Sequence, residues 1–322
     1  MIVKITKITF AILGVFMLTT SCLDNEVGEK EDQASQKIQD YISRNGYTEA
    51  QNIGYGIYVK VIEEAEDGAP IPEIGQRILM SYTGKLTNEE VFETTDSTKS
   101  NLITYPEIHI YGPKKYIVGN QIFGMDTALR TLPEGSKAEI VIPHQYAFGD
   151  YEPVVYNVDI HKVIEDDSTY EAETFAAFRS NNMFVDTLYQ GLYYKLPEGG
   201  ELSDTVVVQR NDSATIQIHA YYAEDYYADH TGRRFYPRSY ETEILKYSFG
   251  ADGYYPLLPA VDSVVKYLNI NQTAEITFDS GAESTGNVWG LGQNGWVDPV
   301  YNIYIIEAYT PLHYRVKLLG VE

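Results

Sequence analysis

The chain has 322 residues, of which 44% are hydrophobic and 13% aromatic, so it is rich enough in apolar side chains to form globular cores. At this length roughly two domains are expected. The 46 acidic residues against 24 basic ones give a formal net charge of −22. That charge argues against nucleic acid as a partner, because phosphate binding needs a basic surface.

Residues 1–22 have the three parts of a bacterial export signal. Lys4 and Lys7 supply a positive start, residues 8–18 form an apolar run too short to span a bilayer, and small residues precede Cys22, the only cysteine. The segment resembles a bacterial lipoprotein signal. This resemblance implies that residues 1–21 are removed as a signal peptide and that Cys22 is lipidated. The alternatives are an uncleaved anchor and a buried free thiol.

A polar, acidic stretch, LDNEVGEKEDQ, follows Cys22 and suits a flexible tether. Its acids resemble the surface-export signals of lipoproteins from gut Bacteroidetes. We therefore expect a protein of the cell envelope that a lipid anchor holds in the outer membrane. Both the periplasmic side and the cell surface are open as its location.

An internal repeat divides the rest of the chain. Residues 56–61 read GIYVKV and residues 191–196 read GLYYKL, and each follows a segment with helical spacing. Alternating strands, PVVYNVDI at 153–160 and PVYNIYII at 299–306, mark the two ends. The sequence therefore predicts a duplicated domain. The helical positions are Ala34, Ile38, Tyr41 and Ile42 in the first copy and Phe175, Ala176 and Phe178 in the second.

The first copy has the pattern of a sheet with one helix. Period-two runs predict strands at 77–86, 107–111, 137–142 and 153–163. Between the second and third of these, QIFGMDTALRTLPEG at 121–135 has the periodicity of an amphipathic helix. A helix beside a twisted antiparallel sheet predicts an α+β fold in which the helix covers the concave face. The residues expected on its apolar face are Phe123, Met125, Ala128, Leu129 and Leu132.

Four segments resemble, in order and spacing, the FK506-binding-protein (FKBP) type of peptidyl-prolyl cis-trans isomerase domain: SYTGKL with VFETT, QIFGMDTALRTLPEGSKAEIVIP, QYAFG and PVVYNVDI. The resemblance covers about residues 56–164. The signal, the leading helix and the G-x-Y-x-K strand are similar to lipid-anchored members from Bacteroidetes. The implied fold is two FKBP-like domains in tandem, each a twisted antiparallel sheet wrapped around one short helix and preceded by a helical segment.

The expected boundaries follow from the repeat and the resemblance. The acidic run at 164–174 predicts a protease-sensitive linker. The segments are 1–21 for the signal peptide, 22–55 for the tether and leading helix, 56–164 for the first domain, 165–184 for the linker and helix, and 185–322 for the diverged second domain.

The resemblance implies a peptidyl-prolyl isomerase, or rotamase, that assists the folding of exported proteins. Its partners would be proline-containing peptide segments, and no cofactor or metal is expected. An X-Pro bond crosses a barrier of ~18–20 kcal/mol, and an apolar cleft that removes water from the planar amide favours the twisted form. Carried over residue by residue, the site consists of Tyr82, Phe92, Ile122, Met125, Phe148 and Tyr156 around the cleft, with Glu93 as its carboxylate.

Departures from the family pattern predict a weakened site. Met125 stands where an aromatic floor is typical, Glu93 replaces an Asp, and Phe148 lacks the hydroxyl of the usual tyrosine. The loop from Gly149 to Tyr156 is shorter than the loop that closes over the proline in catalytic members. A non-catalytic peptide- or protein-binding module with the same fold is therefore the alternative, and each of these side chains taken alone is more ordinarily a core residue.

The second copy has diverged further. Residues 218–237 keep a strand, loop and G-x-x-F outline ending at Phe235, and 247–278 keep the strand, helix, strand order. Its Tyr-Tyr pairs at 193–194, 221–222, 226–227 and 254–255 fit strand packing better than stacking platforms. GLGQNG at 290–295 lacks the strand and helix context of a dinucleotide site, and EDYYADH at 224–230 is a weak metal signal.

Overall fold

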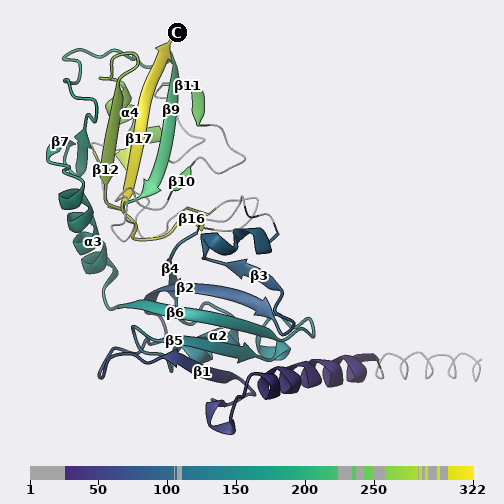
Figure 1. The fold of residues 1–322 in the computed structure, drawn as a ribbon. Coiled ribbons are helices and arrows are strands. Elements are labelled where there is room, and N and C mark those ends of the chain that lie inside the picture. Colours follow the sequence, from purple (N-terminus) through teal and green to yellow (C-terminus); the bar gives the residue numbers. More distant parts are fainter. Residues whose placement is uncertain are drawn as a thin grey trace, which may run out of the picture. The chain divides into compact units, whose positions relative to one another are not determined.

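The computed structural model describes residues 26–104, 106, 111–223, 234–236, 243–249, 258–281, 283–284, 287–288, 296–297 and 304–322. Contacts divide the chain into two compact units. The first comprises the described residues up to 104 together with 116–163, and the second those within 105–115 and from 164 onward. Each unit is built on its own sheet around its own core (Figure 1). Among the described helices, none combines the length and the hydrophobicity that a membrane-spanning segment needs.

The first unit opens with the N-terminal helix, residues 26–44 of the described chain. Its sheet has the strand order β1-β5-β6-β2-β3, with β4 paired to β2. The elements are η1 (Glu49–Gln51), β1 (Tyr58–Glu63), β2 (Arg77–Leu86), β3 (Val91–Thr94), η2 (Ser97–Leu102), β4 (Lys114–Ile117), α2 (Phe123–Leu129), β5 (Lys137–Ile142), η4 (His144–Tyr146) and β6 (Val154–Ile164).

The strongest strand patterns of this unit are confirmed. β2 and β5 have the predicted bounds, and β6 differs from its prediction by one residue at each end. The segment predicted at 107–111 lies almost wholly outside the described residues. β4 was not predicted, because its sequence KKYI puts two lysines side by side and all four residues are only half-buried.

Helix α2 covers the sheet, as its periodicity predicts, but it is shorter than the predicted segment. Met125, Ala128 and Leu129 are buried against the sheet, and Leu132 is buried in the turn that follows the helix. The prediction for Phe123 is wrong, since its side chain is 50% exposed. Phe123 is the first residue of the helix, and its ring lies 5.2 Å from that of Tyr55 and 5.3 Å from that of Tyr146.

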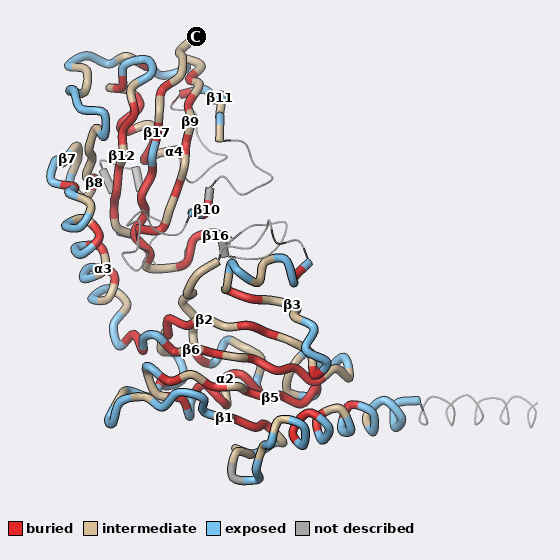
Figure 2. The backbone as a smooth tube through the Cα atoms, viewed as in Figure 1, coloured by how far each residue is buried: buried red, intermediate tan, exposed pale blue. Residues whose placement is uncertain are grey.

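The N-terminal helix covers the opposite face of the same sheet. Its predicted apolar positions are buried, and Figure 2 shows them as buried segments on an otherwise exposed helix. Because strand residues alternate between faces, the strand side chains that meet this helix are not those that meet α2. The sheet therefore has a core on each side. The outer cluster contains Ile38, Tyr41, Ile42, Tyr58, Val141 and Val155.

The second unit has a seven-stranded sheet of order β10-β9-β17-β12-β8-β7, with β11 paired to β9. Two further two-stranded pairs, β13 with β14 and β15 with β16, lie outside this sheet. The elements are α3 (Asp167–Asn181), β7 (Asp186–Tyr189), β8 (Leu192–Lys195), β9 (Ser213–Tyr222), β10 (Arg234–Tyr236), β11 (Ile244–Ser248), α4 (Leu258–Val265), β12 (Thr273–Phe278), β13 (Glu283–Ser284), β14 (Asn287–Val288), β15 (Trp296–Val297), β16 (Tyr304–Ile306) and β17 (Leu312–Val321).

The two sheets share one topology. Read from β8, the second sheet runs β8-β12-β17-β9-β10 with β11 on β9, which matches β1-β5-β6-β2-β3 with β4 on β2 element by element. The helices also correspond, because α2 precedes β5 and α4 precedes β12. The duplicated α+β fold is thus confirmed, and β7 is an addition to the second copy.

One marker of the duplication was misplaced. The segment 299–306 was predicted to end the second copy, yet its described part, Tyr304–Ile306, is β16 and pairs with β15 outside the main sheet. The strand in the position of β6 is β17, Leu312–Val321. Both segments alternate polar and apolar residues, so periodicity alone does not tell them apart.

The predicted linker also differs from expectation. From Asp167 onward it is helix α3, which begins where the Asp166 side chain accepts a hydrogen bond from Thr169 N at 2.7 Å. Glu171 is buried and accepts hydrogen bonds from the backbone N and Oγ of Ser280, each at 2.6 Å. The acidic run was predicted to be a protease-sensitive linker, and one of its carboxylates, Glu171, is buried and bonded to Ser280.

The repeat includes the turn after the leading helix. In the first unit, Asn45 Nδ2 donates to the carbonyl of Tyr41 at 2.9 Å, and the Asn45 carbonyl accepts from Lys60 Nζ at 2.9 Å. Lys60 is the cross-strand neighbour of Glu139, whose carboxylate accepts from Tyr47 Oη at 2.7 Å. The helix end, β1 and β5 are thereby linked by polar contacts.

The second unit repeats this arrangement. Asn182 Nδ2 donates to the carbonyl of Phe178 at 3.0 Å, and the Asn182 carbonyl accepts from Lys195 Nζ at 3.0 Å. Lys195 is the cross-strand neighbour of Glu275, and their charged atoms lie 3.0 Å apart. The shared contacts make each leading helix an integral part of its repeat. The neighbour of the carboxylate differs between the units. Glu139 in the first unit accepts a hydrogen bond from Tyr47, whereas His313 Nε2 lies 3.6 Å from Glu275 in the second.

Candidate functional site

A single carboxylate joins three strands of the first unit. Glu93, on β3, accepts a hydrogen bond from Tyr82 Oη of β2 at 3.0 Å through Oε2, and one from Tyr156 Oη of β6 at 2.7 Å through Oε1. Both carboxylate oxygens are therefore engaged, so the side chain has a fixed orientation. Hydrogen bonds to a charged acceptor are stronger than those between neutral groups.

Aromatic rings surround this carboxylate. Phe92 meets Tyr156 edge to face, with ring centroids 5.8 Å apart and an interplanar angle of 89°, and meets Phe148 at 6.1 Å and 85°. Tyr82 lies 5.9 Å from Tyr156. These separations and angles are those that aromatic pairs prefer. Contacts therefore connect five of the seven predicted site residues into what we call the Glu93 cluster: Tyr82, Phe92, Glu93, Phe148 and Tyr156.

Solvent exposure differs across the cluster. Tyr156 is only 4% exposed, whereas Phe148, in the loop after η4, is 56% exposed. Burial raises the pKa of Tyr156, and the negative charge and hydrogen bond of Glu93 raise it further. The Tyr156 hydroxyl therefore keeps its proton at physiological pH and remains a donor.

Helix α2 supplies the two remaining predicted residues. Met125 is 4% exposed and belongs to the same hydrophobic core as Tyr156, the core against which Tyr82 and Phe92 pack. Ile122, at the N-cap of the helix, is half-buried and packs on this core too. Close packing fixes the helix position, because a Cβ added at Gly124 would lie 2.2 Å from Ile142 Cγ2 of β5.

Two participants were not predicted as site residues. Gly84, opposite Glu93 on β2, has no room for a side chain, because a Cβ there would lie 2.8 Å from both the Phe92 and the Tyr156 rings. Tyr116 of β4 meets Tyr82 at 5.6 Å. Gly84 stands within the quoted SYTGKL segment, but a glycine in an alternating strand gives no hint of which rings approach it.

The short loop after Gly149 is held against the N-terminal helix. Tyr151 has a left-handed backbone, φ 65°, and its ring lies 5.1 Å from that of His144. Lys30 Nζ of the helix lies 5.9 Å from the Tyr151 ring centroid, and Lys37 forms an ion pair with Glu152. The loop thus packs on the helix. Phe148, the residue just before Gly149, belongs to the Glu93 cluster through its contact with Phe92.

The second unit has a buried counterpart of this cluster. Tyr314 of β17 pairs with Ile276 as Tyr156 pairs with Ile140, and its ring lies 6.3 Å from that of Phe235 on β10. Phe235 and Tyr314 are almost fully buried, and in the described residues the Tyr314 hydroxyl has no hydrogen-bond partner. Tyr236 follows Phe235 where Glu93 follows Phe92. The second unit therefore has a buried pair, Phe235 and Tyr314, where the first unit has Phe92 and Tyr156.

Three tyrosines of the two described pairs, Tyr193, Tyr221 and Tyr222, have the packing contacts that were predicted. Tyr222 is buried and Tyr221 stacks on His313 at 5.5 Å, while Tyr193 lies 6.0 Å from Phe175 of α3. Cys22, EDYYADH at 224–230 and GLGQNG at 290–295 lie outside the described residues, as do two of the tyrosine pairs. The described side chains include no group of three or more His, Cys, Asp or Glu placed to hold a metal ion.

The chain was compared with known proteins. Residues 68–169 match the model of the FKBP-type peptidyl-prolyl cis-trans isomerase family. FK506-binding protein 1 of Debaryomyces hansenii is 32% identical over 93 residues, which are 29% of this chain and 72% of that protein. The FKBP-type 22 kDa peptidyl-prolyl cis-trans isomerase of Escherichia coli is 28% identical over 134 residues, 38% of this chain and 58% of that protein. The chain thus spans little more than half the length of this second relative.

The site and these matches define the class. The chain belongs to the FKBP-type peptidyl-prolyl cis-trans isomerase family, and the matched residues are those of the first unit. Among solved structures, the crystal structure of the three FKBP domains of wheat FKBP73 aligns with 83% of this chain and 94% of its own, at 10% identity and a TM-score of 0.27. A peptidyl-prolyl cis-trans isomerase from Pseudomonas syringae aligns with 42% of this chain and 96% of its own, at 19% identity and a TM-score of 0.33.

Proposed function

We propose that the first unit is a peptidyl-prolyl cis-trans isomerase acting on proline-containing segments of exported proteins, with the Glu93 cluster as its site. The observation that carries the proposal is the fixed carboxylate between the hydroxyls of Tyr82 and Tyr156, under rings from three strands and one loop. The same elements belong to the segment that matches the isomerase family.

Such a site needs no nucleophile and no metal. The barrier to rotation, ~18–20 kcal/mol, comes from the partial double bond of the amide, which is strongest when the amide is planar and hydrated. In this proposal Phe92 and Tyr156 form the apolar wall for the proline ring and Met125 its floor. Glu93 holds the two tyrosine hydroxyls in place, and the apolar surroundings favour the less polar twisted amide.

A non-catalytic peptide-binding module is the second candidate. The observation that favours it is the short loop, which packs on the N-terminal helix through Tyr151 and Glu152. Met125 in place of an aromatic floor points the same way, although a flexible thioether still fills an apolar site. The two candidates differ in catalysis: a binding module binds proline-containing peptides but does not accelerate their isomerisation.

An isomerisation assay with the full chain without its signal distinguishes the isomerase from the binding module. Exchange between the cis and trans forms of an Ala-Leu-Pro-Phe peptide, followed by NMR, takes ~10–100 s uncatalysed at 25 °C. We expect the protein to accelerate it. Saturable binding of the peptide without acceleration would instead establish the binding module, and neither binding nor acceleration would contradict both.

We also propose that the protein is anchored in the outer membrane through lipidated Cys22. Support comes from residues 1–22 alone, whose charged start, apolar run and small residues before the sole thiol are typical of a lipoprotein signal. We expect Cys22→Ser to abolish lipid labelling and to release the protein from membranes or stop its processing. Unchanged labelling and membrane fractionation of the variant would contradict the anchor.

A further inference from the structure

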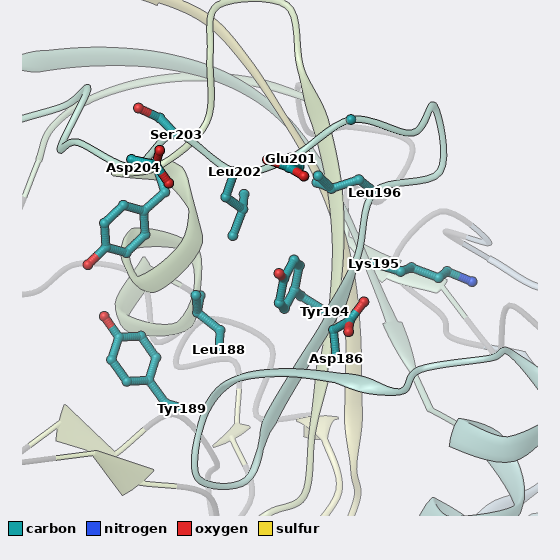
Figure 3. Close-up of a pocket in the computed structure, with 12 residues that line it drawn as sticks. Asp186, Leu188, Tyr189, Tyr194, Lys195, Leu196, Glu201, Leu202, Ser203 and Asp204 are labelled. Atoms are coloured by element: carbon teal, nitrogen blue, oxygen red, sulfur yellow. The ribbon is translucent and has the colours of Figure 1, made fainter.

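The second unit contains a cavity of about 730 Å³ beside strands β7 and β8 of its sheet (Figure 3). Ligand pockets commonly have volumes of about 300–1,000 Å³. None of its lining residues belongs to the Glu93 cluster or to the buried counterpart of that cluster. The apolar lining comes from β7, β8, the loop after β8 and the turn after α4, and consists of Leu188, Tyr189, Tyr194, Leu196, Leu202 and Tyr267.

Two leucines and a tyrosine form an apolar part of the otherwise largely polar cavity. Leu188, Tyr194 and Leu202 point toward one another across it in Figure 3. All three are half-buried and pack against the hydrophobic core of the unit. An apolar side chain placed between them would remove further apolar surface from water, which is favourable by about 25 cal/mol per Å².

The walls of the cavity are held by specific contacts. Ser203 N donates to the carbonyl of Tyr267 at 2.9 Å, which ties the loop after β8 to the turn after α4. Lys266 Nζ lies 5.1 Å from the ring centroid of Tyr189 and 5.0 Å from that of Tyr267. This cation therefore interacts with the two rings of the wall, and the cavity does not depend on a single flexible loop.

The rim of the cavity is acidic. Asp186, Glu201 and Asp204 are exposed lining residues. The one basic lining residue, Lys195, points away from the cavity in Figure 3 and forms its ion pair with Glu275 at 3.0 Å. A ligand with positive charges around an apolar centre therefore matches this lining.

The cavity adjoins the edge of the sheet. β7 is the terminal strand, and β8 is the only described strand that pairs with it. A terminal strand presents backbone N–H and C=O groups to which an extended peptide can add. Alternate side chains of an added strand point to the same face, so one of them can enter the cavity while its neighbours reach the rim.

From these features we infer that the second unit binds an extended peptide segment in which a leucine or phenylalanine is flanked by lysines or arginines. The peptide backbone adds beside β7, the apolar side chain occupies the space between Leu188, Tyr194 and Leu202, and the cationic side chains face the acidic rim. The inference does not depend on isomerase activity in the first unit.

Fluorescence anisotropy of the full chain without its signal tests this site. The probe is a fluorescein-labelled peptide with two lysines on each side of a Thr-Leu-Thr-Phe-Thr centre, and a second probe has glutamates in place of the lysines. The rim variant Glu201→Lys reverses one charge at an exposed position. Glu173→Lys, at an exposed position on α3, is the matched charge control. Leu202→Glu introduces a charge inside the cavity, and its circular dichroism melting curve reports whether the fold survives.

We expect the lysine probe to bind saturably, the glutamate probe to bind at least about ten-fold more weakly, and the rim variant to lose at least about five-fold in affinity for the lysine probe. Glu173→Lys should bind as the wild type does. Absence of binding by the wild type, or equal affinity of the wild type and the rim variant, would overturn the inference. An equal loss in Glu173→Lys would also overturn it, because it would show attraction by net charge alone.

Discussion

Glu275 illustrates how a buried charge is retained in this fold. Burial by itself raises the pKa of this carboxyl, but the neighbouring His313 and Lys195 outweigh burial and hold the pKa at about 2. Arg315 Nε lies 4.0 Å from the same carboxylate. Because Glu139 occupies the same place in the first unit, with Lys85 Nζ at 3.2 Å, the arrangement is a repeated stabilising feature.

The shift at Glu275 predicts a pH-dependent stability. The folded pKa of about 2 lies below the ordinary value of 4.5, so the carboxylate stabilises the fold fully above about pH 4.5 and loses this contribution as the pH falls toward 2. We expect Glu275→Gln to lower the free energy of unfolding by on the order of 3 kcal/mol at pH 6. Urea denaturation at pH 6, 4 and 3 should show this deficit shrinking, and a deficit independent of pH would contradict the assignment.

Gly84 sets the spacing of the proposed site. A Cβ at this position would meet Phe92 and Tyr156 at 2.8 Å, so Gly84→Ala must displace at least one ring. We expect a loss of about 1–3 kcal/mol in stability and a fall of about ten-fold in kcat/KM for proline isomerisation. Gly320→Ala is the matched strand control, since nothing lies within 4 Å of its added Cβ. If both variants behave as the wild type does, the ring contacts are not important for the site.

At the scale of elements, the N-terminal helix is a structural part of the first repeat. Tyr41 is 1% exposed and packs on the outer face of the sheet, and the same helix holds the loop that follows Phe148. The corresponding turns after Asn45 and Asn182 show that each copy of the repeat begins with its helix. A domain cut at residue 56 would therefore leave an apolar sheet face uncovered.

This role predicts the effect of Tyr41→Ala. Removing a buried aromatic ring costs about 3–5 kcal/mol, so the first unit should unfold at a distinctly lower temperature. Because the two units have separate cores, calorimetry should resolve two transitions, of which only one shifts. Gln39→Ala, at an exposed position of the same helix, should shift neither. A single transition that moves as a whole would contradict independent cores.

Element by element, the sequence predicted the regular parts of the fold better than its exceptions. Strict alternation located β2, β5 and β6, and the three- and four-residue steps located α2, because burial on one face leaves a period in the sequence. Segments that share a regular pattern but have another tertiary position were harder to predict. Phe123 fits the helical period yet lies beyond the sheet, and 299–306 alternates as well as β17 does. In both cases tertiary position decides what the local pattern leaves open.

The Glu93 cluster was only partly predictable. The resemblance to FKBP domains brought together residues from three strands, a helix and a loop, which no periodicity could do. It did not identify Gly84 or Tyr116, and it did not show that Tyr156 donates to Glu93, because hydrogen bonds between distant strands depend on register and bulges. The contacts of the short loop with Lys30 and Lys37 also depend on the docked N-terminal helix.

For the whole molecule, one topology carries two different candidate sites. The first copy has a half-buried Phe92 followed by the carboxylate of Glu93, where the second copy has a buried Phe235 followed by Tyr236. The second copy instead adds β7 and the cavity beside it. Divergence after duplication thus left a candidate isomerase site on one unit and placed a candidate peptide site at a different position on the other.

The rate of proline isomerisation by the full chain tests the central claim most directly. We predict acceleration by the wild type and a fall in kcat/KM of about ten-fold or more in Phe92→Ala, equivalent to ~1.4 kcal/mol of lost transition-state stabilisation. Phe123→Ala, which removes an exposed ring outside the Glu93 cluster, should retain the rate, and melting curves should show that all variants are folded. Met125→Trp should raise the rate if the methionine floor weakens the site. No acceleration by the wild type, with none gained in Met125→Trp, would contradict the isomerase assignment.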